Sequence, residues 1–151
     1  MKMNSLVTPC LGALAGLALG SSATLWAAPR ASSKAEVRSP EQLCTRSAAS
    51  GTARITPLAQ GEKAFVGMLE LNPGAQVKEH RDPTEEYIHV LQGHGEIVID
   101  GVKHRVSPGT TVYMPAKARV SYSNGSSTMV ALQVFAGPEP ANKYKQWQGC
   151  Q

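Results

Sequence analysis

Residues 74–93 read GAQVKEHRDPTEEYIHVLQG, and this stretch decides the fold of the chain. Two short runs that favour β-structure lie on either side of a loop that contains Pro83. Along the second run, Glu86, Ile88 and Val90 share one face of the predicted strand, because successive side chains alternate between its two faces. A carboxylate on an otherwise aliphatic face is costly to bury alone. The pattern therefore predicts a metal or a hydrogen-bonded partner at Glu86.

The sequence on both sides of this stretch continues the same pattern. Turn residues such as Asp100-Gly101, Pro108-Gly109 and Asn124-Gly125 separate short runs rich in β-branched and aromatic residues. Many short strands with no convincing helix between them indicate an all-β sandwich or a closed barrel. The predicted strands are residues 64–71, 76–79, 86–92, 95–100, 103–106, 111–114, 119–123 and 128–135.

The polar residues of the opening stretch have a familiar spacing. They are Gly74, His80, Asp82, Glu86 and Gly93. This spacing resembles the first motif of the cupin family, which reads Gly, five residues, His, one residue, His, three or four residues, Glu, six residues, Gly. The one departure is Asp82, which stands in place of the second histidine.

The second cupin motif has a counterpart farther along the chain. Gly109, Pro115 and Asn124 match it in register. Lys117 stands where the motif has glycine, and Val120 stands where it has its third metal-binding histidine. The two motifs cover roughly half of the chain, and the departures fall at ligand positions.

The resemblance implies a single antiparallel double-stranded β-helix, the jelly-roll barrel of the cupins, with a small-molecule pocket inside it. In the family, two or three histidines and the glutamate hold a divalent metal. The corresponding set here is His80, Asp82 and Glu86, and one nitrogen with two oxygens favours Mn²⁺ or Fe²⁺ over thiol-loving ions. The alternative is a metal-free pocket in which His80 and Glu86 only make hydrogen bonds. If the strand slips by one residue, Glu85 replaces Glu86 as the inward carboxylate.

Two further residues are expected to line the pocket. Val120 occupies a ligand position of the second motif, and Tyr122 has the same parity along its strand. The Tyr122 hydroxyl could contact a ligand, or the ring could be a core aromatic with its hydroxyl at the rim.

The first residues of the chain indicate export. Residues 1–27 resemble a secretory signal, with Lys2 followed by the apolar run LGALAGLALG at 11–20, and cleavage could follow Ala23 or Ala27. The apolar run is too short to span a bilayer, so no membrane span is expected after cleavage. The predicted location is periplasmic or secreted. Residues 28–61 are expected to form a partly ordered leader, 62–137 the barrel and 138–151 a tail.

Charge and cysteine content restrict the partners of the exported chain. The formal net charge is +4, but the basic residues are scattered among acidic ones, which argues against nucleic acid. Cys44 and Cys150 are expected to pair in an oxidising compartment, and two free or intermolecular thiols are the alternative. The resemblance also implies a homodimer.

Two classes of function follow from the sequence. The first is a metal-dependent enzyme that acts on a small polar metabolite by oxygenation, isomerisation or decarboxylation. The second is a binding module that has kept the barrel and lost the metal, consistent with Asp82, Lys117 and Val120.

Overall fold

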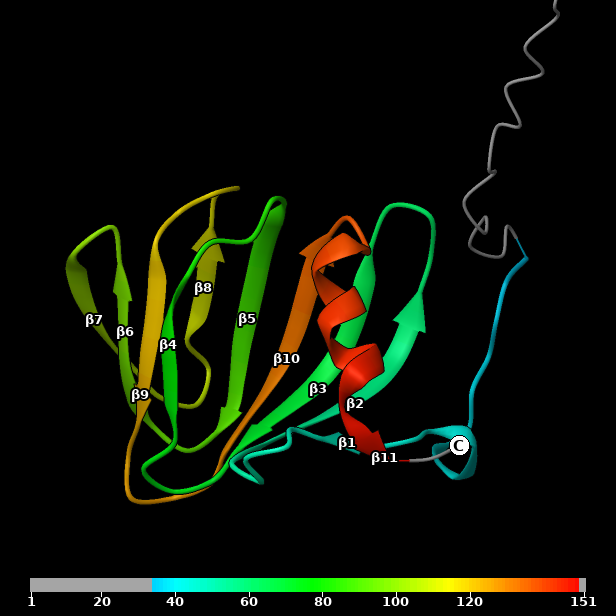
Figure 1. The fold of residues 1–151 in the computed structure, drawn as a ribbon, viewed down its shortest axis with the longest axis horizontal. Helices are drawn as coiled ribbons and strands as arrows, with labels where there is room; N and C mark the ends of the chain where they lie inside the picture. Colours follow the sequence, from blue (N-terminus) through cyan, green and yellow to red (C-terminus); the bar gives the residue numbers. More distant parts are fainter. Residues whose placement is uncertain (1–33, 150–151) are drawn as a thin grey trace, which may run out of the picture.

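The structure, a computed structural model, describes residues 34–149 and consists mainly of antiparallel strands (Figure 1). Two 3₁₀ helices flank the strands, η1 (Pro40–Gln42) and η2 (Glu139–Gln146). The strands are β1 (Arg46–Ser47), β2 (Ala53–Gln60), β3 (Phe65–Leu71), β4 (Gln76–His80), β5 (Glu85–Gln92), β6 (Gly95–Ile99), β7 (Val102–Val106), β8 (Thr111–Met114), β9 (Val120–Asn124), β10 (Met129–Ala136) and β11 (Gln148–Gly149).

The strands form two sheets that face each other (Figure 1). The larger sheet has the order β11-β1-β2-β3-β10-β5-β8, and the smaller has the order β4-β9-β6-β7. Their inner faces enclose one cluster of buried residues: Leu71, Ala75, Val90, Ile97, Val106, Met114, Ala118, Val120, Tyr122, Met129 and Ala131. This arrangement confirms the predicted all-β class and the jelly-roll barrel.

Strand β5 shows how alternation determines the two faces of the larger sheet. Glu86 and Val90 are buried, whereas Tyr87 and Leu91 between and beyond them are exposed. The strand pairs with β10 on one side and with β8 on the other, where Glu86 lies opposite Met114. The inward carboxylate is therefore Glu86, as the aliphatic spacing predicts, and the alternative with Glu85 is wrong.

All eight predicted strands are present, with ends within one residue of the predicted ones. The sheet also extends into the segment that was expected to be a leader, because β2 pairs along its length with β3. The register of this pair shifts between Pro57 and Ala59. Proline lacks the N–H of a regular ladder and is tolerated at such an irregularity. The barrel therefore begins before residue 62.

The segment after the barrel is also ordered. The larger sheet extends past the smaller one, and η2 lies against the exposed part of its inner face, over β3 and β10 (Figure 1). There Ala141 and Tyr144 of η2 pack with Ile55, Phe65 and Phe135 of the sheet. The Phe65 ring lies 6.0 Å from that of Phe135 and 5.9 Å from that of Tyr144, centroid to centroid. Burial of these aromatic rings fixes η2 on the barrel.

Some predictions fall outside the described residues. They are the signal segment 1–27 with its cleavage positions, and Cys150. Within residues 34–149, no helix combines the length and the apolar character that a bilayer crossing requires.

Candidate functional site

Three predicted ligands meet at one end of the barrel. His80 is the last residue of β4, Glu86 is the second residue of β5, and Asp82 lies in the loop that joins these strands. One nitrogen or oxygen of each lies within 4.8 Å of the others. Within residues 34–149 this is the one cluster of its kind. The loop at Pro83 therefore does not separate the three side chains, and they converge as the sequence predicts.

A backbone hydrogen bond orients the His80 ring. Its Nδ1 lies 2.9 Å from the carbonyl oxygen of Lys78, and a carbonyl can only accept, so Nδ1 carries the proton. In the neutral ring Nε2 is then unprotonated, and it lies 3.7 Å from Oδ2 of Asp82. Metal-binding histidines commonly donate their other ring N–H to a carbonyl in this way, which fixes the tautomer. The donor set of His80, Asp82 and Glu86 therefore fits a divalent cation.

Glu86 is the buried member of the cluster, with 6% of its surface exposed. Its Oε1 accepts a hydrogen bond of 2.6 Å from Nε2 of Gln133, and Oε1 of Gln133 accepts one of 2.7 Å from the hydroxyl of Tyr144. Burial raises the pKa of Glu86, while the bond from Gln133 opposes that change. Burial also raises the pKa of Tyr144, so its hydroxyl stays protonated and donates. The chain of bonds holds the carboxylate in place.

A lysine from η2 supplies a positive charge beside the carboxylates. Nζ of Lys143 lies 3.3 Å from Oδ2 of Asp82, and 5.0 Å and 5.4 Å from the ring centroids of Phe135 and Tyr144. The ammonium thus binds a carboxylate and two aromatic faces together. It also works against the raised pKa of Glu86. Lys143 therefore contacts one of the three residues that would hold a metal ion.

The loop that carries Asp82 is held by the turn between β8 and β9. The backbone N–H of Lys117 donates to the carbonyl oxygen of Asp82 at 2.7 Å, and the Arg81 guanidinium donates to the carbonyl oxygen of Lys117. Lys117 has a φ of 67°, in the left-handed region that favours glycine. Lys117 therefore adopts a backbone conformation suited to the glycine of the motif, and this conformation is strained for lysine.

Val120 and Tyr122 both line the cavity of the barrel. Val120 lies directly opposite His80 in the pairing of β9 with β4, so a histidine at this position would point at the cluster. Valine supplies no ligand. The Tyr122 ring is buried and its hydroxyl donates to Oδ1 of Asn124 at 3.2 Å. Tyr122 is therefore a cavity-wall aromatic whose hydroxyl is already bonded.

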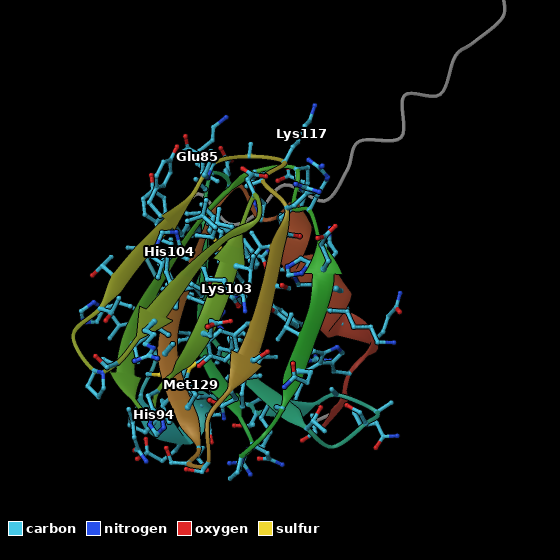
Figure 2. The ribbon with its side chains drawn as sticks, turned by 90° about the vertical axis from the view of Figure 1, so that its left-hand side faces the viewer. Glu85, His94, Lys103, His104, Lys117 and Met129 are labelled. Atoms are coloured by element: carbon cyan, nitrogen blue, oxygen red, sulfur yellow. The ribbon has the colours of Figure 1, made fainter. Side chains whose placement is uncertain are left out.

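The cluster lies at one end of a cavity of about 490 Å³. Figure 2 shows Lys117, whose backbone holds Asp82, at one end of the barrel and His94 at the other. Met129, which lines the same cavity, lies toward the His94 end (Figure 2). A cavity of this size is typical of small-molecule sites, which span about 300–1,000 Å³.

The remaining histidines lie away from the cluster. His89 faces outward on β5 and pairs with the Thr111 hydroxyl at 2.8 Å. His94 and His104 are exposed, in the turn after β5 and on β7 respectively (Figure 2). None of the three belongs to the ligand set.

The sequence did not reveal Gln133, Lys143 and Tyr144. Gln133 does carry a signal, because it is a polar residue at the inward parity of β10, between Ala131 and Phe135. The contacts of Lys143 and Tyr144 have no such local signal. They depend on η2 folding back onto a sheet whose strands lie far away in the sequence.

Comparison with known proteins agrees with this architecture. A family model described as the cupin domain matches residues 67–135. An RmlC-like cupin from Shewanella frigidimarina NCIMB 400 superposes with a TM-score of 0.62 and 14% identity, over 69% of this chain and 92% of that one. The cupin domain of Cnp3 from Schizosaccharomyces pombe gives 0.55 and 18%, over 62% and 71%. These structures share the double-stranded β-helix with this chain, and the matching family model identifies residues 67–135 as a cupin domain.

Two curated relatives resemble parts of the sequence. Dimethylsulfoniopropionate lyase DddW from Ruegeria pomeroyi is 34% identical over 73 residues, which are 45% of this chain and 48% of that protein. Protein SchB from Streptomyces halstedii is 30% identical over 88 residues, or 57% and 64% of the two chains. The chain thus spans about half of the first relative and under two thirds of the second.

Proposed function

We propose that this cupin-family protein is a metal-dependent enzyme that acts on a small-molecule carboxylate. The observation that carries the proposal is the convergence of His80, Asp82 and Glu86 within 4.8 Å at the end of an internal cavity. The orientation of the His80 ring supports it, because Nδ1 is bonded to the backbone and Nε2 faces the Asp82 carboxylate. The partial resemblance to a lyase of dimethylsulfoniopropionate, itself a carboxylate, supports the choice of substrate class.

The three ligands would hold a Mn²⁺ or Fe²⁺ ion and leave coordination positions open. Such an ion supplies Lewis-acid chemistry, which polarises a bound carboxylate or carbonyl. Lys143 provides a second positive charge beside that position, and Gln133 fixes the Glu86 carboxylate through its amide. Oxygenation, isomerisation, decarboxylation and lyase chemistry are the reaction types compatible with these groups.

A second candidate is a metal-free binding module. The ion pair between Lys143 and Asp82 favours it, because an ammonium already neutralises a carboxylate where a metal would bind. Val120 favours it as well, since the site lacks the third histidine of the family motif.

Metal content separates the two candidates. The purified protein is loaded with Mn²⁺ or Fe²⁺, dialysed and measured by elemental analysis. The enzyme proposal expects about one ion per chain, lost in His80→Ala and retained in His89→Ala, whose ring faces outward and serves as the matched control. Absence of a retained ion from the loaded protein, or equal content in both variants, would contradict the metal centre.

Export and the disulfide are further parts of the proposal. Gly149, the neighbour of Cys150 in sequence, pairs with Arg46 across β1 and β11, and Arg46 is two residues from Cys44. A bridge between these cysteines would close a loop of roughly 105 residues and contribute about 4 kcal/mol on the chain-entropy model. Thiol titration of the secreted protein, unfolded but not reduced, should find no free thiol. Two free thiols per chain would remove the bridge.

A homodimer also remains a proposal. The outer face of β5 and β8 exposes a pair of tyrosines, Tyr87 and Tyr113, whose ring centroids lie 5.2 Å apart. Both hydroxyls donate to the carboxylate of Glu85. Exposed aromatic groups of this kind are enriched in protein interfaces. Sedimentation velocity of the protein at micromolar concentration tests the dimer, and a monomer under those conditions would exclude it.

A further inference from the structure

We propose that the ligand of this cavity is an amphipathic monocarboxylate, with its carboxylate at the His80, Asp82 and Glu86 cluster and a hydrocarbon body inside the barrel. The inference rests on the proposed function and specifies its substrate class. The proposed ligand is charged at one end only, whereas the sequence led us to expect a small polar metabolite.

The first observation is the composition of the cavity wall. Away from the cluster, most of the side chains that line the cavity are aliphatic or thioether, and they come from both sheets. These residues are Leu69, Leu71, Val77, Ile88, Val90, Ile97, Val106, Val112, Met114, Val120 and Met129. Transfer of apolar surface from water to such a wall is favourable by about 25 cal/mol per Å². The body of the cavity therefore selects hydrocarbon.

The second observation is that the hydroxyl and amide groups in the cavity wall away from the cluster are already paired. The Tyr122 hydroxyl bonds Asn124, and the Gln76 amide oxygen accepts from the Ser123 hydroxyl at 2.7 Å. Ser50 and Thr52, also in the lining, are exposed and bond each other at 2.8 Å. A ligand with hydroxyls along its length would lose water without gaining partners here, which disfavours sugars and hydroxylated metabolites.

The third observation is the charge at the polar end. Asp82 and Glu86 supply two negative charges when they hold a metal, and Lys143 adds a positive charge to that of the divalent ion. The loaded centre thus carries one positive charge in excess. Because the site is partly shielded from water, it favours an anionic head over a neutral or cationic one.

A series of straight-chain carboxylates tests the hydrocarbon body. Butanoate, hexanoate and octanoate are titrated into the full-length, metal-loaded protein with ¹³C-labelled methionine methyl groups. Mg²⁺ replaces a paramagnetic ion where line broadening requires it. Met114 and Met129 line the cavity, whereas Met68 does not and is the internal control. Affinity should rise about fourfold per methylene, which is about 250-fold over the four methylenes from butanoate to octanoate.

Head-group and wall variants complete the test. Octanoate should bind more tightly than octanol or octylammonium, and Lys143→Met should reduce that preference. Val112→Phe, which fills part of the cavity, should weaken octanoate binding at least tenfold, whereas Tyr113→Phe on the outer face should not.

The outcomes separate this inference from the function on which it rests. A protein that retains metal but binds the three carboxylates equally, or that shifts Met68 as much as Met114, overturns the hydrocarbon-bearing ligand and leaves the metal centre intact. A protein that retains no metal overturns the proposed function. In that case the same series on the metal-free protein still decides the hydrocarbon body, because a flat affinity across chain length refutes it.

Discussion

The hydroxyl of Tyr144 gives a direct measure of how η2 is attached to the barrel. Tyr144→Phe keeps the ring that packs 5.9 Å from Phe65 and 4.9 Å from Trp147, and removes only the donor to Gln133. Oε1 of Gln133, whose residue is 3% exposed, then loses the partner that the structure gives it. Leaving a buried acceptor unpaired costs about 1–3 kcal/mol. We therefore expect a loss of that size in the free energy of unfolding.

Urea denaturation measures this loss. With a slope of about 1.5–2 kcal/mol per molar urea, the midpoint should fall by roughly 0.5–2 M at unchanged slope. Tyr113→Phe is the matched control, because its hydroxyl also donates to a carboxylate, that of Glu85, but from an exposed position. The control should change stability by less than about 0.5 kcal/mol. Equal midpoints for the two variants would refute the reasoning that Gln133 depends on Tyr144.

Three further substitutions test the centre itself. The pKa of Glu86 is raised in the folded state, while in the unfolded chain it is about 4.3. The metal-free protein therefore loses stability as the pH rises from the pKa of the unfolded state to that of the folded state. The loss is about 1.4 kcal/mol for each unit by which the two pKa values differ. Glu86→Gln should therefore be more stable than wild type at pH 8 and converge with it near pH 4 in urea denaturation, and equal curves at pH 8 would contradict a raised pKa. Val120→His, opposite His80, should tighten Mn²⁺ binding at least tenfold in a chelator competition, and no change would show that position 120 does not face the ion. Lys117→Gly relieves the left-handed backbone and should raise the free energy of unfolding by about 0.5–1 kcal/mol in thermal denaturation, and a loss would indicate that the lysine side chain has a structural role.

Much of the barrel was predictable because its strands carry local signals. Period-two alternation along β5 and the glycine turns between strands identify both the elements and the inward face. Strand β2 was missed for a physical reason. It contains Pro57 at an irregular register position and few β-branched residues, so its pairing with β3 depends on the sheet rather than on its own propensity.

The residues of the candidate site also fall into two groups, those with a local sequence signal and those without one. His80, Asp82 and Glu86 lie within seven residues of one another, and parity was enough to bring them together. Lys143 and Tyr144 are about sixty residues away, and only the packing of η2 on the uncovered part of the larger sheet places them at the cluster. The local sequence pattern reveals the candidate metal ligands. The residues that contact and position these ligands are brought to them only by the tertiary structure.

The departures from the family motif make physical sense together with Lys143. Aspartate in place of histidine at position 82 adds a negative charge beside Glu86, and the Lys143 ammonium, 3.3 Å from the Asp82 carboxylate, offsets it. The same ammonium repels an incoming cation. Lys143→Met should therefore tighten Mn²⁺ binding by about 1–2 kcal/mol, or roughly tenfold, a size set by the partial exposure of the lysine. Lys145→Met on the same helix is the control, because Lys145 is exposed and outside the cavity lining. Weaker metal binding in Lys143→Met would show instead that the lysine organises Asp82 for the ion, and the argument for charge compensation would fail.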